Sequence, residues 1–475
     1  MKPTPVLFVA LLFGLPLAQA VVEWRNHDKI GALEVFGSLE ESRLRKFEED
    51  LADASLVRTE LAPWLQLGLT KTLGRGNEKA IVGWDGALHL AADLDSISAA
   101  SYLDGAINPV DAIVDFHRQL KLRGVELLLL PTPEKTASSP STFLFDLSGV
   151  QIPHPDTAEF FEQLAQADIE FVDLFEFYKT LTGRLYLKRD THWTPGTMES
   201  VATEVARRAT ELVEIPKTRE WSTEPEQFYS SGDMLGMLNY PRGRSPYLLM
   251  QIETQRVLDA ESGNPCVPDR SSPVLLLGDS FTRVFSDEQL GLGEHAGLQE
   301  HLAKELSTSI DVIALAGGGA RAVRESLARR KEGLTGKRIV IWQFSMRDLP
   351  MISNHWECID LGQPRTAPPV EGQIEVTAEV VEVTRVENFE YAFGLAIFEY
   401  RIMAAHSGEV DGDSLWIAHI AVQDFNPTEA ASYNVGDTHR LVLEPIEKHY
   451  DLESTSWADD TDADFEIWFP VRRVE

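Results

Sequence analysis

The chain has few cysteines and no cluster of histidines, which argues against several classes of metal site. Only two of the 475 residues are cysteines, Cys266 and Cys358. No HExxH motif or group of closely spaced histidines accompanies them, so the sequence predicts neither a metal site nor a cofactor. The disulfide question depends on the compartment, because bridges form and persist in oxidising environments.

Basic residues are also far fewer than acidic residues. Lysine and arginine number 43 against 75 aspartates and glutamates, which gives a net charge of -32. Such an acidic protein is a poor partner for nucleic acid or an anionic membrane surface. An anionic polysaccharide stays open as a ligand, because a local basic groove can exist on an acidic protein.

Long apolar runs are missing after the N-terminus, where no segment approaches the ~20 residues that span a bilayer. The first twenty residues combine Lys2, an apolar stretch at Val6–Leu17 and a small-x-small pattern at Ala18–Ala20. This predicts a signal peptide over residues 1–20 and export to the periplasm, with an uncleaved inner-membrane anchor as the alternative. In an exported chain, two cysteines favour one disulfide, with two unpaired thiols as the other possibility.

The chain is long enough for two or three domains. Residues 21–365 alternate helical patterns with short apolar runs, which predicts a doubly wound, mostly parallel α/β sheet preceded by a hairpin at Ala80–Leu90. The expected strands are Val125–Leu130, Glu170–Leu174, Val274–Leu277, Asp311–Leu315 and Arg338–Phe344, and the expected helices are Val110–Arg123, Phe160–Ala167 and Thr197–Leu212.

The pattern changes after a proline-rich stretch that contains Pro364, Pro368 and Pro369. Residues 371–475 are acidic and alternate apolar and polar residues with a period of two. This predicts a small all-β C-terminal domain, either a barrel or a sandwich.

The segment Leu275–Thr282 carries the first chemical signal. An apolar run ends in Gly-Asp-Ser, which predicts a buried strand that delivers Ser280 to its carboxyl end. Open α/β sheets bind their ligands at that edge. Because a serine alone is a weak nucleophile, it needs a base and a carboxylate that orients the base.

One compact candidate for that pair lies upstream, in Asp190-Thr-His-Trp193. His192 suits the role of base, and Asp190 suits the role of orienting carboxylate. By itself, Asp-x-His-Trp is more often a helix-capping loop with a structural histidine, and Gly-Asp-Ser by itself is also a weak signal because Asp and Ser commonly cap helices. Their joint presence on an α/β chain favours acyl transfer through Ser280.

Acyl transfer also needs donors for the oxyanion of the tetrahedral intermediate. The backbone N–H of Ser280 is one candidate. Gly317 and Gly318 follow a predicted strand and lack side chains, so their backbone can approach a ligand closely, although a plain loop explains these glycines equally well.

The order of these motifs, Asp-x-His-Trp first and Gly-Asp-Ser later, resembles the alginate O-acetyltransferase family of AlgJ and AlgX-like proteins. Their catalytic domain is SGNH-hydrolase-like with a permuted motif order. Residues 82–88, 130–135, 190–196 and 341–349 also resemble this family, so the likeness covers about residues 25–350. Ala87 departs from it, since an aromatic residue is expected there, and the C-terminal domain does not obviously resemble the AlgX-like carbohydrate-binding module.

The resemblance implies a periplasmic enzyme that moves an acetyl group through an acetyl-serine onto hydroxyls of an exopolysaccharide, with a membrane-bound O-acyltransferase as the acetyl donor. Carried over residue by residue, Asp190, His192 and Ser280 form the triad. Lys135 and Arg347 are candidate substrate contacts, with surface salt bridges as the alternative for both.

Two other functions fit the same sequence. The same residues serve an acetylesterase if water replaces the sugar acceptor. A scaffold that binds or assembles exopolysaccharide, with a vestigial triad, is the alternative from outside the enzymes.

Overall fold

The computed structural model describes most of the chain from residue 61 onward, namely residues 61–84, 86–105, 107–139, 150–287, 290–315, 317, 319–330, 333–351, 356–362, 372–385, 393–408, 412–423, 426–449, 452, 455–458, 461 and 467–473. The predicted signal peptide, the proline-rich stretch and Gly318 lie outside these residues, so the predicted domain boundaries stay predictions. The chain divides into two compact units. One contains residues up to Ala91 together with 188–190 and 231–249, and the other contains the rest.

The first unit is built around the predicted hairpin, which is confirmed. Strand β1 (Ala80–Val82) pairs antiparallel with β2 (Leu88–Leu90), and Gly86 adopts a positive φ of 77° in the turn. Helix α11 (Asp233–Met237) supplies Met234 to the small core that Ala80 and Leu88 form. Helix α4 (Ala62–Leu73) joins through Thr70, whose hydroxyl lies 3.0 Å from the Tyr240 hydroxyl.

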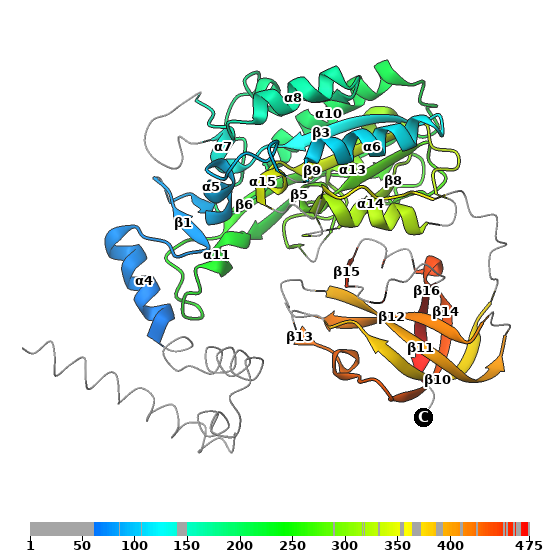
Figure 1. The fold of residues 1–475 in the computed structure, drawn as a ribbon. Helices are drawn as coiled ribbons and strands as arrows, with labels where there is room; N and C mark the ends of the chain where they lie inside the picture. The colour runs from blue at the N-terminus through cyan, green and yellow to red at the C-terminus, as the bar shows by residue number, and fades with distance from the viewer. Residues whose placement is uncertain are drawn as a thin grey trace, which may run out of the picture. The chain divides into compact units, whose positions relative to one another are not determined.

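The second unit contains the predicted parallel sheet (Figure 1). Its five strands lie in the order β4-β3-β9-β7-β8, and every neighbouring pair is parallel. The strands are β3 (Glu126–Thr132), β4 (Glu170–Phe171), β7 (Val274–Gly278), β8 (Asp311–Ala314) and β9 (Ile339–Ser345). The last of these five strands along the chain, β9, fills the centre of the sheet, so the carboxyl ends of β3, β9 and β7 meet where the winding direction reverses. That is the usual ligand-binding edge of such a sheet.

Successive strand residues point to opposite faces of the sheet. Because the strands are nearly continuous apolar runs, both faces are apolar. Leu128 and Leu130 of β3 pack on one face, and Leu127 and Leu129 pack on the other. The first face is covered by α9 (Leu174–Tyr178), α10 (Pro195–Leu212) and α13 (Leu298–Leu306), and the second by α6 (Pro109–Lys121), α8 (Thr157–Gln166) and α14 (Gly319–Arg329). The short helices are α5 (Ala91–Ile97), α7 (Lys135–Ser138), α12 (Ser280–Arg283) and α15 (Asp348–Met351).

A long antiparallel ribbon was not predicted. Strand β5 (Trp221–Ser230) pairs along its whole length with β6 (Met250–Asp259). Most of β5 is exposed, and Pro225 lies in its middle. A proline and several charged side chains argue against a strand in the sequence, yet an exposed ribbon tolerates both.

The predicted all-β C-terminal domain is confirmed as a closed barrel. The strands β10 (Ile374–Val383), β11 (Phe393–Ser407), β12 (Ser414–Gln423), β14 (Thr438–Pro445) and β16 (Ile467–Arg473) form a ring, because β11 pairs with β12 as well as with β10. Two short strands extend it, β13 (Asn426–Pro427) and β15 (Ser456–Ala458), and two short 3-10 helices accompany it, η6 (Glu429–Ser432) and η7 (Ile446–Lys448). Closure protects the edges that an open sheet would expose.

Three polar side chains lie inside this barrel. The Tyr400 hydroxyl is 3.0 Å from Nε2 of His419 and 2.9 Å from Nδ1 of His439, and all three residues are buried. Burial lowers the pKa of His419 to about 3 and also lowers the pKa of His439. Both imidazoles are therefore neutral near pH 7, and the hydroxyl satisfies one nitrogen of each.

The predicted disulfide is wrong, because Cys266 and Cys358 are both free. Cys266 is buried among the residues on one face of the parallel sheet. Two neighbours of Cys358 belong to the opposite face: Trp356 packs in that core, and the Glu357 carbonyl accepts a hydrogen bond from Arg324 of α14. The sheet thus separates the two thiols.

No helix within the described part of the chain has both the length and the apolar character that crossing a membrane requires.

Candidate active site

Ser280 occupies the position that the sequence predicted for it, at the carboxyl end of a central strand. Strand β7 is buried along its whole length and ends at Gly278, and Ser280 is the first residue of α12. The Asp279 carboxylate caps this helix by accepting the Phe281 N–H at 2.8 Å. Ser280 itself is partly exposed, as a nucleophile must be.

The serine turn is tied to its neighbours by a buried amide. Oε1 of Gln343, on β9, accepts the Asp279 N–H and the Thr282 hydroxyl, both at 3.0 Å. Nε2 of Gln343 donates to the Thr132 hydroxyl of β3 at 3.2 Å. One side chain therefore links the ends of three adjacent strands, which fixes the turn in space.

Gly278 is required by this arrangement. A Cβ at that position would lie 2.0 Å from the Thr282 hydroxyl oxygen and 2.7 Å from the Thr282 Cβ. Only glycine leaves room for the threonine to reach Gln343.

Asp279 has a second role besides the helix cap. Its other carboxylate oxygen accepts the Ser345 N–H at 2.9 Å, at the end of β9. Burial, reinforced by the charge of Asp348, raises the pKa of Asp279 to about 6. Asp279 is thus a structural carboxyl that gains a proton just below neutral pH.

His192 lies beside the serine turn. The chain doubles back around it, since Leu187 N–H donates to the His192 carbonyl at 3.0 Å and Tyr186 bridges to Trp193. The imidazole is buried and meets the Phe281 ring edge-on, with 5.0 Å between centroids. Because Phe281 directly follows Ser280, this contact brings the predicted base and the nucleophile turn together.

Trp193 packs against Phe281 as well, with 5.1 Å between ring centroids. Thr194 then caps α10 by accepting the Thr197 N–H, and Pro195 occupies the first helical position. The helix therefore begins two residues before the predicted segment Thr197–Leu212, because proline suits the first helical position.

Asp190 belongs to the first unit, although only one residue separates it from His192 in the chain. Its side chain is fully buried, and Oδ2 accepts the Asp233 N–H at 2.9 Å. The neighbouring Lys188 carbonyl accepts the Leu88 N–H of β2 at 2.9 Å. The carboxylate is therefore held by α11, and the backbone that precedes it is held by the hairpin of the same unit.

Of the two glycines predicted to bind the oxyanion, the structure describes Gly317. Gly317 follows β8 and has a positive φ of 73°, which favours glycine there. The end of β8 adjoins the serine strand, because Leu315 N–H donates to the Gly278 carbonyl at 2.9 Å. Gly318 lies outside the described residues.

Lys135 and Arg347, proposed as cleft residues, enter a buried ionic cluster instead of surface salt bridges. Lys135 is 2% exposed, and its Nζ donates to the Leu187 carbonyl at 2.7 Å. Arg347 pairs with the buried Asp93 at 2.8 Å.

Sequence reasoning missed the two acids of this cluster, Asp93 and Glu134. Glu134 accepts the Ser96 hydroxyl at 2.9 Å, and burial next to the charge of Asp93 raises its pKa to about 7. Burial also raises the pKa of Asp93, although the Arg347 charge opposes the shift. Neither residue lies in a recognisable motif, and only the adjacency of Glu134 to Lys135 hinted at a charged cluster.

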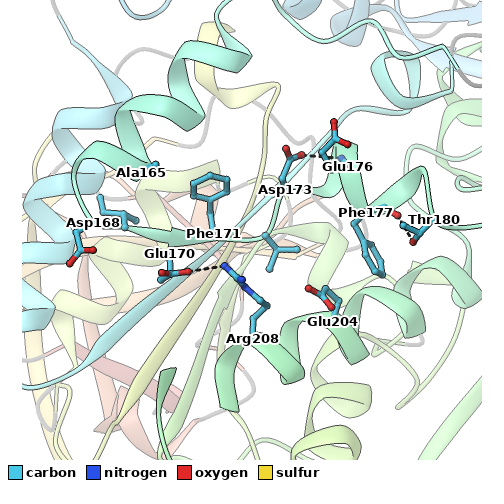
Figure 2. Close-up of a pocket in the computed structure, with 12 residues that line it drawn as sticks. Ala165, Asp168, Glu170, Phe171, Asp173, Glu176, Phe177, Thr180, Glu204 and Arg208 are labelled. Carbon is cyan, nitrogen blue, oxygen red and sulfur yellow. Dashed lines mark hydrogen bonds and ion pairs between the residues drawn. The ribbon is translucent and has the colours of Figure 1, made fainter. Parts of the chain in front are cut away.

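A separate groove of about 550 Å³ runs along edge strand β4 (Figure 2). Most of its charged lining is acidic, and Arg208 is paired with Glu170 at 2.7 Å. The acids are Asp168, Glu170, Asp173, Glu176 and Glu204. Strands β3 and β9 separate β4 from β7, so the groove and the serine turn occupy different parts of the sheet.

Comparisons with known proteins agree with the resemblance expected from the motifs. A family model described as the SGNH hydrolase-like domain of acetyltransferase AlgX matches residues 95–346. No curated protein matches the chain.

Three solved structures resemble the chain at low identity. The O-acetyltransferase domain of Pseudomonas putida AlgJ is 19% identical, with a TM-score of 0.45, over 57% of this chain and 92% of that one. Pseudomonas aeruginosa AlgX is 16% identical, with a TM-score of 0.45, over 64% of this chain and 71% of that one. Bacillus cereus PatB1 is 14% identical, with a TM-score of 0.32, over 52% of this chain and 92% of that one. The family model spans more than half of the chain, which therefore belongs to the family of SGNH hydrolase-like acetyltransferase domains that includes AlgX.

Proposed function

We propose that this protein is an O-acetyltransferase that moves an acetyl group through Ser280 onto a hydroxyl of an exopolysaccharide in the periplasm. The observation that carries the proposal is the contact between the His192 ring and Phe281, the residue next to Ser280. Membership of the AlgX acetyltransferase family supports the reaction class.

The reaction takes place in two matched halves. Ser280 Oγ attacks the acetyl carbonyl carbon while His192 accepts the hydroxyl proton, and the donor's leaving group departs with that proton. A sugar hydroxyl then attacks the acetyl-serine, its proton passes to His192, and the Ser280 oxygen leaves with it. Both halves need a neutral imidazole at the start.

Three further groups complete the proposed machinery. Asp190 orients His192 by accepting its second ring N–H and stabilises the imidazolium that forms. The Ser280 and Gly317 N–H groups stabilise the oxyanion.

A membrane-bound O-acyltransferase supplies the acetyl group, and residues 1–20 direct the chain across the inner membrane.

The test uses purified wild-type chain and Ser280→Ala with p-nitrophenyl acetate as donor and a mannuronate oligosaccharide as acceptor. Mass spectrometry of the sugar is expected to show added acetyl groups with the wild type and none with the variant. Release of free acetate alone, lost in Ser280→Ala, would favour the esterase. Absence of any Ser280-dependent turnover would favour the scaffold.

A further inference from the structure

A buried lysine is an energetically costly feature near the proposed active site. Lys135 follows β3, and its side chain is almost entirely removed from water. Burying an ammonium group costs several kcal/mol unless nearby charges and hydrogen bonds compensate. The contacts of the Lys135 amine therefore show which groups offset this cost.

The amine holds the loop that carries His192. Lys135 Nζ donates to the Leu187 carbonyl at 2.7 Å, and the same Leu187 donates its N–H to the His192 carbonyl at 3.0 Å. A single residue, Leu187, therefore connects the lysine to the histidine. The Tyr186 hydroxyl adds a second tie by donating to the Pro133 carbonyl at 2.5 Å. Residues 133–135 thus hold the loop at two adjacent points.

The charge of the lysine is balanced by carboxyl groups from other elements. The carboxylate of Asp93, on α5, is stabilised by the charges of both Arg347 and Lys135. Glu134 adds a carboxyl next to Lys135 in the chain, and Asp348 adds another beside Arg347. Asp93 thus interacts with both cations and offsets part of the charge of each.

We propose that Lys135 is a positioning residue for His192: through the Leu187 carbonyl it fixes the histidine loop relative to the end of β3. This inference rests on the proposed function of His192 as the base. Lys135 does not contact the substrate in this arrangement. It acts by setting where the imidazole lies with respect to Ser280.

The decisive variant is Lys135→Met, which keeps the length of the side chain and removes its donor and charge. A misplacement of about 1 Å lowers the rate of such a reaction ~100-fold. We expect the rate of Ser280 acylation by p-nitrophenyl acetate to fall roughly 10- to 100-fold, with KM unchanged. Lys179→Met is the matched control, because Lys179 is exposed and pairs only with Glu176 among the described residues; its rate should equal that of the wild type.

Tyr186→Phe gives a second test if Lys135→Met does not fold. It deletes only the hydroxyl that reaches Pro133, and a smaller fall in kcat with constant KM is expected. Unchanged acylation in a folded Lys135→Met protein, or a rise in KM without a fall in kcat, would overturn the inference.

A readout independent of turnover separates this inference from the proposed function. The His192 ring resonances, identified by their loss in His192→Gln, should shift in Lys135→Met, because the loop that carries the imidazole loses its tie to Lys135. Lys179→Met should leave these resonances unchanged. If the resonances move while no variant shows Ser280-dependent chemistry, the positioning role stands and the proposed function fails. If they do not move, the positioning role is wrong, whatever the activity.

Discussion

Gly278→Ala should damage both stability and activity, because the space beside this glycine is already filled. The new Cβ would lie 2.0 Å from the Thr282 hydroxyl, which must then leave Gln343. Overpacking a core position costs ~1–3 kcal/mol. Breaking a buried hydrogen bond costs a further ~1–3 kcal/mol. The expected loss in the free energy of unfolding is therefore about 2–6 kcal/mol.

The effect on activity should exceed the effect expected from reduced stability alone. Thr282 and Ser280 share the short helix α12, so displacing the threonine also shifts the nucleophile. A shift of about 1 Å predicts ~100-fold slower acylation in protein that is still folded. Urea unfolding monitored by circular dichroism gives the stability, and the burst of p-nitrophenol gives the acylation rate.

Two companion variants make this prediction refutable. Gly196→Ala adds the same methyl group at an exposed helical position with nothing within 4 Å, and should be neutral or stabilising by up to ~1 kcal/mol. Thr282→Ala combined with Gly278→Ala removes the closest contact, so the two losses should sum to more than the loss in the double variant. A Gly278→Ala protein with wild-type stability and acylation would refute the reasoning.

Three further outcomes are expected from the buried groups. Because the folded pKa of Glu134 is raised to about 7 from 4.5, this carboxyl contributes about 3 kcal/mol of stability that is lost as pH rises from 4.5 to 7, and Glu134→Gln should remove this contribution from urea unfolding across that range. Because the folded pKa of His419 is lowered to about 3, this imidazole contributes an opposite slope, a loss of about 1.4 kcal/mol for each pH unit below 6.5, and His419→Gln should remove that contribution. Since Cys266 is buried and Cys358 exposed, a thiol reagent should label only Cys358 in the native protein and both residues after unfolding, and a reductant should leave the melting temperature unchanged.

The parallel sheet was predictable because its strands are buried on both faces. Such strands are continuous apolar runs, as in Val274–Leu277, and each is followed by a helical pattern. Strand β4 is shorter than predicted, since Glu170–Leu174 gives only Glu170–Phe171 before the chain turns at Asp173 to start α9. The Asp173 carboxylate caps that helix, so a residue assigned to the strand ends it instead.

The ribbon of β5 and β6 escaped prediction for the opposite reason. Strand β6 buries Met250, Ile252 and Val257, but β5, which pairs with it along its whole length, is mostly exposed, so no periodic hydrophobic signal marks β5. The disulfide was predicted from the count of cysteines alone, which carries no information on which face of the sheet each thiol occupies.

The candidate site was predictable in its motifs but not in its supporting contacts. Ser280 and His192 stood out because nucleophile and base have characteristic neighbours in the sequence. The burial of Lys135 and its carboxyl partners depends on where β3, α5 and β9 end in space, and local sequence does not encode that. Gln343 is likewise a single amide in a strand, and its role emerges only when three strand ends meet.

The most direct test of the account is to locate the acetyl group on the protein. The full chain is exposed briefly to p-nitrophenyl acetate, quenched in acid and digested, and the acetylated peptide is sequenced by mass spectrometry. We expect acetyl on Ser280, absent in Ser280→Ala and strongly reduced in His192→Gln. Acetyl on another residue, or acetyl transfer that persists in Ser280→Ala, would contradict the claim that this serine carries the reaction.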